Sequence, residues 1–91
     1  MTRQEILDKL KPIVRKSVSS VEVTTEEITE DTSLADDLAF DSLDFVEMTL
    51  RMEEEFNITD RDAIWDDTID AIWNDSNVTV KDLVDLIEQI Q

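Results

Sequence analysis

The apolar residues at the start of the chain recur at the three- and four-residue intervals of one helix face; they are Ile6, Leu7, Leu10, Ile13, Val14 and Val18. Thr2 and Glu5 have the spacing of a capping box, so the pattern predicts a first helix from about residue 3 to residues 17–20. Pro12 lies inside this stretch, where a proline removes a backbone hydrogen bond at a cost of roughly 3 kcal/mol. We therefore expect a bend at Pro12, or a regular helix only from just after it.

The periodicity lapses between residues 19 and 39, where Thr, Ser, Asp and Glu dominate. This composition predicts a long connection that its apolar residues hold to the core; they are Val21, Val23, Ile28, Leu34 and Leu38. Long connections in small domains often have a function or contain a short helical turn. Residues 25–28 are the candidate for such a turn.

A second helix is predicted from the N-cap Asp41, with Asp44 three residues on, to about Phe56. On a helical wheel, one stripe forms its core face; it consists of Phe45, Met48, Met52 and Phe56. The opposite side mixes apolar and acidic residues; these are Leu43, Glu47, Leu50 and Glu54, with Val46 on the border. Isolated exposed leucines are ordinary. Leu43 and Leu50, however, lie seven residues apart with carboxylates beside them, and this arrangement favours a docking surface.

A third helical stretch is predicted over residues 59–74, with Asp62 supporting its start, and the run Asp75-Ser76-Asn77 ends it. Thr79 and Asp82 then cap a last helix. Its apolar face consists of Val80, Leu83, Val84, Ile87 and Ile90. The chain is thus predicted to be all-α, a small four-helix bundle that forms one domain over residues 1–91. Because it has no glycine, Asn, Asp or Ser must serve at helix ends and turns.

The formal net charge of −16 is unevenly distributed, since five of the eight basic residues fall within the first sixteen positions. Only Arg51, Arg61 and Lys81 follow, against 22 carboxylates from Glu22 onward. Such a field should repel nucleic acid and anionic membranes and attract basic protein surfaces. The alternative is that the charge serves only solubility, and charge alone does not separate the two. No secretion signal and no apolar stretch of about 20 residues is present, so we expect a soluble, cytoplasmic protein.

Ser42, at the front of the second predicted helix, is the candidate for chemistry. The chain contains no His and no Cys, so it lacks the usual base for a serine nucleophile and the usual zinc ligands. Ser42 is therefore better suited to modification by another enzyme than to attack on a substrate. The dipeptide Asp41-Ser42 taken alone indicates only a helix start. A helix N-terminus would, however, stabilise a phosphoester on that hydroxyl.

A metal ion would have to be a hard cation held by carboxylates. The runs that could contribute ligands are Asp36-Asp37, Asp66-Asp67 and Asp75-Ser76-Asn77. The last of these lacks the glycine and the terminal glutamate of an EF-hand loop. We expect weak screening of carboxylate repulsion and no dedicated metal site.

The run from Asp41 to Met48 resembles the attachment motif of the acyl carrier proteins, in which Asp-Ser-Leu precedes an acidic continuation. The stretch from Met52 to Phe56 is similar to that family's Glu-rich helix end, and the resemblance reaches the final Thr79-Val80-Lys81-Asp82-Leu83. It implies that a phosphopantetheinyl transferase moves phosphopantetheine from coenzyme A onto Ser42, with Asp41 and Leu43 beside it. The chain would carry acyl intermediates as thioesters to enzymes of fatty acid, polyketide or related lipid biosynthesis, and would not itself be an enzyme.

The resemblance also implies which residues meet the basic docking surfaces of those enzymes; they are Asp41, Leu43, Asp44, Val46, Glu47, Leu50, Glu53 and Glu54. We expect a monomer that binds no nucleic acid and inserts into no membrane. A carrier of aminoacyl or peptidyl units is the nearest alternative, disfavoured by the high acidity and by Asp41. A non-carrier acidic adaptor for basic partners, or a nucleic-acid mimic, is the alternative from another class.

Two features depart from the family pattern. Ala39 stands where a glycine is common, followed by bulky Phe40, and alanine makes a positive φ costly, so we expect the loop to differ in detail. The stretch between Ile58 and Thr79 exceeds a short third helix by roughly two to three turns if it is fully helical. It contains Trp65 and Trp73. These tryptophans either extend the core, which we favour, or enlarge an acyl pocket or recognise a dedicated synthase.

Overall fold

The computed structural model describes residues 1–58, 69, 71–72 and 77–90. Within them the chain forms three α-helices and one short 3-10 turn; these are α1 (Arg3–Ser17), η1 (Thr25–Glu27), α2 (Ser42–Glu55) and α4 (Val80–Ile90). The described residues contain no β-strand, only an isolated bridge between Ser33 and Thr79. The all-α prediction is therefore confirmed for this part of the chain.

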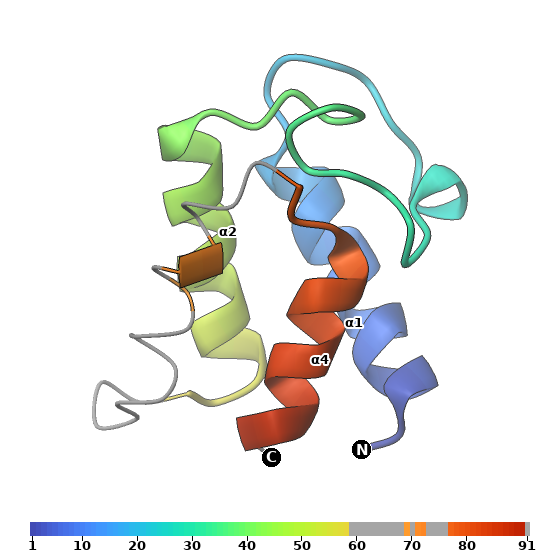
Figure 1. Ribbon diagram of the computed structural model, residues 1–91, viewed down its shortest axis with the longest axis vertical. Coiled ribbons are helices and arrows are strands. Elements are labelled where there is room, and N and C mark those ends of the chain that lie inside the picture. Colours follow the sequence, from blue (N-terminus) through green and yellow to red (C-terminus); the bar gives the residue numbers. More distant parts are fainter. Residues whose placement is uncertain (59–68, 70, 73–76, 91) are drawn as a thin grey trace.

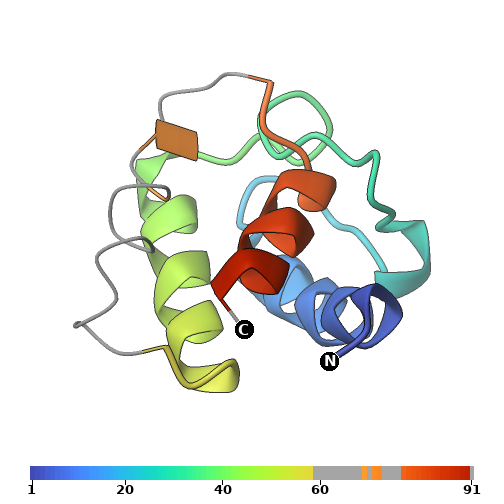
Figure 2. The ribbon, with the colours of Figure 1, turned by 60° about the horizontal axis from the view of Figure 1, so that its bottom comes forward.

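Helix α1 packs against both α2 and α4. Figures 1 and 2 show the three helices around a shared interior, with the long connection from α1 to α2 crossing one end of the molecule. The start of α1 and the end of α4 lie near each other, at the opposite end from the start of α2 (Figure 1). The beginning of α2 is therefore far from the start of α1 and the end of α4, and it is close to the connecting loop.

Helix α1 begins at the predicted capping box. Thr2 Oγ1 accepts a hydrogen bond from the Glu5 amide at 3.2 Å, and Glu5 Oε1 accepts one from the Thr2 amide at 3.2 Å. Hydrogen bonding of the Glu5 carboxylate by Thr2, first by its backbone amide and then by its side chain, lowers the pKa of the Glu5 carboxyl. The helix then runs through Pro12 to Ser17, so the prediction of a regular start only after Pro12 is wrong. The ring removes one intrahelical bond, and the packing of the apolar face outweighs that loss.

The core joins one face of each helix. The predicted core stripe of α2 is buried throughout: Phe45 is 5 % exposed, Met48 and Met52 are 0 % exposed, and Phe56 is 3 % exposed. Helices α1 and α4 meet it with buried aliphatic residues; these are Ile6, Leu10, Ile13 and Val14 from α1, and Val80, Leu83, Val84, Leu86 and Ile87 from α4. The predicted face of α4 is thus confirmed except that Ile90 is only partly buried, and Leu86 was missed.

The long connection is held to the core by most of the predicted residues. Ile28, Leu34 and Leu38 are buried and Val23 is partly buried, but Val21 is 40 % exposed. The prediction for Val21 is wrong, because this residue lines a shallow surface hollow beside charged side chains such as Arg15. The helical turn predicted within residues 25–28 is confirmed as η1.

Backbone hydrogen bonds tie this connection to the start of α4. The Leu34 amide donates to Val78 O at 3.2 Å, the Val80 amide to Thr32 O at 3.0 Å and the Lys81 amide to Glu30 O at 2.9 Å. The predicted cap is present too, since the Thr79 amide donates to Asp82 Oδ2 at 2.9 Å. These bonds satisfy backbone groups that an irregular segment would otherwise leave unpaired.

Helix α2 ends without a glycine, as predicted. Asn57 adopts φ 58, in the left-handed region, and the Ile58 amide donates to Glu53 O at 2.8 Å. This is the bond of a Schellman motif, in which asparagine takes the position that glycine usually occupies.

The third helix predicted over residues 59–74, with Trp65 and Trp73, lies mostly outside the described residues. Within that stretch Ile69, Ala71 and Ile72 are helical, and Ile69 is buried. The four-helix count and the extended third helix stay predictions.

Candidate functional site

Ser42 is the first residue of α2, and it is exposed. The preceding Asp41 is the N-cap, with an extended backbone at φ −102 and ψ −177, and its Oδ1 accepts a hydrogen bond from the Asp44 amide at 2.8 Å. Among the described residues, the Ser42 hydroxyl and the amides of Ser42 and Leu43 have no hydrogen-bond partner. The Ser42 hydroxyl thus lies beside two backbone N–H groups at the positive end of the helix.

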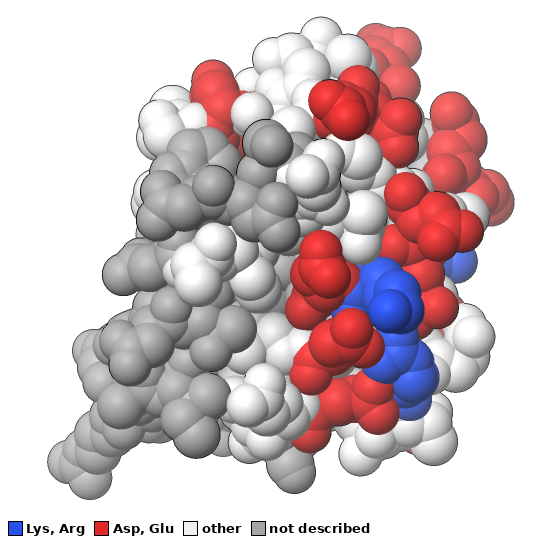
Figure 3. Space-filling view, viewed as in Figure 1, with Lys and Arg blue, Asp and Glu red and all other residues white. Residues whose placement is uncertain are grey.

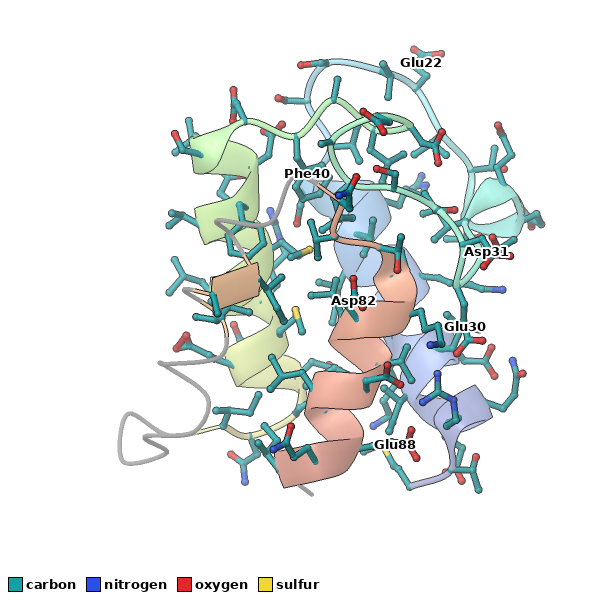
Figure 4. All side chains as sticks on the ribbon, in the orientation of Figure 1. Glu22, Glu30, Asp31, Phe40, Asp82 and Glu88 are labelled. Carbon is teal, nitrogen blue, oxygen red and sulfur yellow. The ribbon has the colours of Figure 1, made fainter. Side chains whose placement is uncertain are left out.

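The loop before Ser42 is held in a strained conformation. Ala39 adopts φ 53, and the next residue, Phe40, donates its amide to Leu34 O at 2.9 Å. The Phe40 side chain, labelled in Figure 4, packs against the core and is partly buried. Alanine therefore takes up the positive φ that was expected to be costly, and the core contact and hydrogen bond of Phe40 hold it there.

Asp44 differs from the other predicted contact residues. It is only 2 % exposed, because its carboxylate accepts hydrogen bonds from Ser19 Oγ at 2.7 Å and from the Asp41 amide at 3.4 Å. The expectation that Asp44 belongs to an exposed acidic surface therefore differs from the structure. Its buried carboxylate is committed to contacts within the chain.

The remaining predicted contact residues lie on the outer side of α2. The three apolar ones are exposed, Leu43 by 65 %, Val46 by 52 % and Leu50 by 60 %. The acidic ones, Asp41, Glu47 and Glu54, are exposed as well, and Glu53 is partly exposed. The structure thus brings apolar and acidic side chains together on one helix face that no described residue covers.

Two residues that the sequence analysis missed link this helix to the end of α1. Arg51 Nη1 donates to Ser17 Oγ at 3.1 Å and lies 3.6 Å from Glu47 Oε2, while Ser19 bonds Asp44 as described above. In the sequence, Ser17 and Ser19 indicate only the end of a helix. Spacing gives no signal for a contact between residues so far apart in the chain.

A groove of about 470 Å³ between α1 and α2 borders the outer face of α2 and shares Glu54 with it. Its walls are mostly charged and include Lys16, Arg51 and Glu55. Such walls do not suit an apolar acyl chain.

Within the described ranges, no three or more carboxylates are placed to hold a metal ion. Asp37 Oδ2 instead accepts the Ser33 amide at 2.7 Å, and Asp36 donates its amide to Ser33 Oγ at 3.0 Å. The other two acidic runs lie outside these ranges apart from Asn77. In the part of the chain that the structure describes, no helix has the length and apolar character needed to cross a membrane.

Comparison with known proteins identifies the family. A family model described as "Phosphopantetheine attachment site" matches residues 12–87. An acyl carrier protein of Guillardia theta is 36 % identical over 89 residues, which cover 98 % of this chain and 95 % of that protein. An acyl carrier protein of Coprothermobacter proteolyticus is 38 % identical over 88 residues, covering 97 % and 93 %.

A third relative, an acyl carrier protein of Petrotoga mobilis, is 40 % identical over 62 residues, covering 68 % of this chain and 69 % of its own. No solved structure matches the chain significantly. The family model and the near full-length relatives agree with the motif around Ser42 and with the helical fold. The chain belongs to the acyl carrier proteins, the family that carries acyl groups on phosphopantetheine.

Proposed function

We propose that Ser42 is the residue of this chain to which phosphopantetheine is attached, and that residues 1–91 act as a single carrier domain. The observation that carries this proposal is the Ser42 hydroxyl itself, which is exposed at the first position of α2 and makes no hydrogen bond to any residue that the structure describes. In the loading step Ser42 Oγ forms a new bond to phosphorus, its proton leaves to a base of the transferase, and the bond from phosphorus to the nucleotide part of coenzyme A breaks.

The residues around Ser42 fit a phosphodiester. Its negative charge would lie at the helix N-terminus, beside the amides of Ser42 and Leu43, which donate to no group in the described part of the chain. The Asp41 carboxylate is close by, but its Oδ1 is already engaged with the Asp44 amide. The capping bond thus keeps that carboxylate turned back onto the helix.

When bound, the arm supplies the thiol that this cysteine-free chain lacks, on which an acyl group is held as a thioester. The chain itself contains no His or Cys, which supports a carrier that performs no turnover of its own. Its contribution is to hold the acyl group near each partner enzyme and so to raise the effective concentration of that group.

We propose the outer face of α2 as the surface that the transferase and the acyl-chain enzymes contact. Leu43, Val46 and Leu50 supply apolar area, and Glu47 and Glu54 supply negative charge around it. Partners with basic docking surfaces would be steered to this face by charge and held by burial of the leucines. A cytoplasmic location stays a prediction.

The direct test is loading by a phosphopantetheinyl transferase with coenzyme A, followed by mass spectrometry. We expect a mass increase of one phosphopantetheinyl group, located on the peptide that contains Ser42. Ser42→Ala should abolish the increase, while Ser20→Ala, which removes another exposed hydroxyl, should leave it unchanged. A folded wild-type chain that no competent transferase loads, or a loaded Ser42→Ala chain, would refute the proposal.

A further inference from the structure

Asp44 is the one carboxylate that is buried among the described residues, at 2 % exposure. A carboxylate withdrawn from water must be compensated by hydrogen bonds, or its burial destabilises the fold. The shorter of the two bonds that its oxygens accept, at 2.7 Å, comes from Ser19 Oγ. The other, from the Asp41 amide, measures 3.4 Å and is weak. Ser19 is therefore the main donor that keeps this carboxylate in place.

Asp44 in turn determines how α2 begins. Its amide bonds Asp41 Oδ1 and its carboxylate accepts the Asp41 amide, so the two residues form a reciprocal capping box around Ser42 and Leu43. Rotation of the Asp44 side chain would remove one half of this box. The backbone of Ser42 would then be held only by the bonds that continue into the helix.

Ser19 lies just beyond the end of α1, in the connection that crosses the same end of the molecule as the start of α2 (Figure 1). A second bond joins the same two elements, from Arg51 Nη1 to Ser17 Oγ at 3.1 Å. Ser17 is itself buried and donates to Ile13 O at 2.8 Å, so the end of α1 is firmly placed. A hydroxyl two residues beyond the fixed end of α1 thus bonds to the first turn of α2.

We propose that Ser19 is a positioning residue for Ser42: its hydroxyl, through Asp44 and Asp41, fixes the first turn of α2 in the geometry in which the Ser42 hydroxyl is loaded. The inference rests on the proposed function. Among the described residues, Ser19 makes no hydrogen bond to Ser42 or to an exposed residue of α2. Its loss should therefore lower kcat for loading and change KM little, since KM depends on the docking surface.

The test compares three variants in steady-state loading by a phosphopantetheinyl transferase. We expect Ser19→Ala to lower kcat roughly fivefold to tenfold, with KM within about twofold of wild type. This is less than the full effect of one lost hydrogen bond to a charged group, because Ser19 acts on Ser42 only through Asp44 and Asp41. Ser19→Thr keeps the hydroxyl and should restore kcat. Ser20→Ala is the matched control, because Ser20 is an exposed serine without a hydrogen-bond partner among the described residues.

Amide hydrogen exchange supplies a readout that does not depend on loading. Ser19→Ala should speed exchange of the Asp44 and Phe45 amides, which donate to Asp41 in the first turn of α2. The exchange rate of the Phe56 amide, which donates to Met52 O at the far end of α2, should stay unchanged. The inference would be overturned by any of three results. These are an equal kcat for Ser19→Ala and wild type, a lowered kcat that Ser19→Thr does not restore, and a lowered kcat/KM that comes from a higher KM alone. Failure of wild type to load at Ser42 would instead refute the proposed function.

Discussion

Ala39 is the residue at which the backbone near the candidate site is most constrained. A residue with a Cβ at φ 53 is less stable than in the right-handed or extended regions by roughly 1–2 kcal/mol. Three residues later the chain places Ser42 at the start of α2. The loop therefore reaches the attachment position through a conformation that glycine would adopt more easily.

Ala39→Gly should stabilise the protein. Relief of the left-handed strain outweighs the extra chain entropy of glycine in the unfolded state, which leaves a net gain of about 0.5–1 kcal/mol. Chemical or thermal denaturation measures this gain. Ala35→Gly is the matched control, because exposed Ala35 has no positive φ and should lose up to about 1 kcal/mol. Equal destabilisation by both substitutions would show that Ala39 is not strained.

The capping residues of α2 show which structural features the sequence pattern can predict and which it cannot. Asp41 as N-cap and Asp44 as its partner follow from spacing alone, because a cap depends only on neighbours within one turn. The burial of Asp44 does not follow, since it depends on a hydroxyl from Ser19, outside the helix. The same acidic residue was thus correctly placed in the helix and incorrectly placed on the surface.

At the scale of the element, α2 has two faces that the 3.6-residue period separates. Phe45, Met48 and Met52 face the core, while Leu43 and Leu50 lie in water. A helix fixes this division geometrically, so the wheel predicted both faces without knowledge of the fold. Exposed leucines contribute little to stability, and they are free to contribute to binding instead.

Leu50→Ala should weaken the encounter with the transferase while leaving the fold intact. Leu50 is 60 % exposed, so its truncation should change the free energy of unfolding by less than about 0.5 kcal/mol. Loss of an apolar anchor should raise KM for loading about fivefold or more, with kcat little changed. Val21→Ala, at an apolar residue 40 % exposed and away from α2, should leave KM unchanged. If both variants load with the KM of the wild type, Leu50 is not part of the docking surface.

At the scale of the whole molecule, Arg3 joins three parts of the chain. Its guanidinium contacts Asp85 Oδ1 at 2.5 Å and Glu30 Oε1 at 2.7 Å, and it also bonds Glu88. Figure 4 labels Glu30 and Glu88, which come from the connecting loop and from α4. Figure 3 shows basic side chains gathered on this side of the molecule and bordered by acidic ones. The hydrogen bonds that Arg3 donates to Asp85, Glu88 and Glu30 raise its pKa, so Arg3 stays charged.

Arg3→Gln should lower Tm more than Arg15→Gln does, although both remove one positive charge. The first substitution leaves three carboxylates close together without a shared cation, while exposed Arg15 has no ion pair among the described residues. The difference in Tm should shrink in about 1 M salt, where the Debye length falls to about 3 Å. Thermal unfolding followed by circular dichroism at low and high salt measures it. Equal Tm values for the two variants at low salt would contradict the role given to Arg3.

The sequence by itself determined the local features of this protein: where α1, α2 and α4 lie, how they are capped, and which side of α2 meets water. Each of these depends on residues within about one helical turn, which the chain order already brings together. Only the tertiary structure decided which distant groups meet, such as Ser19 with Asp44 and Arg3 with Glu30, Asp85 and Glu88. Such contacts arise when packing closes long loops, and no periodicity along the chain records which side chains that closure brings together.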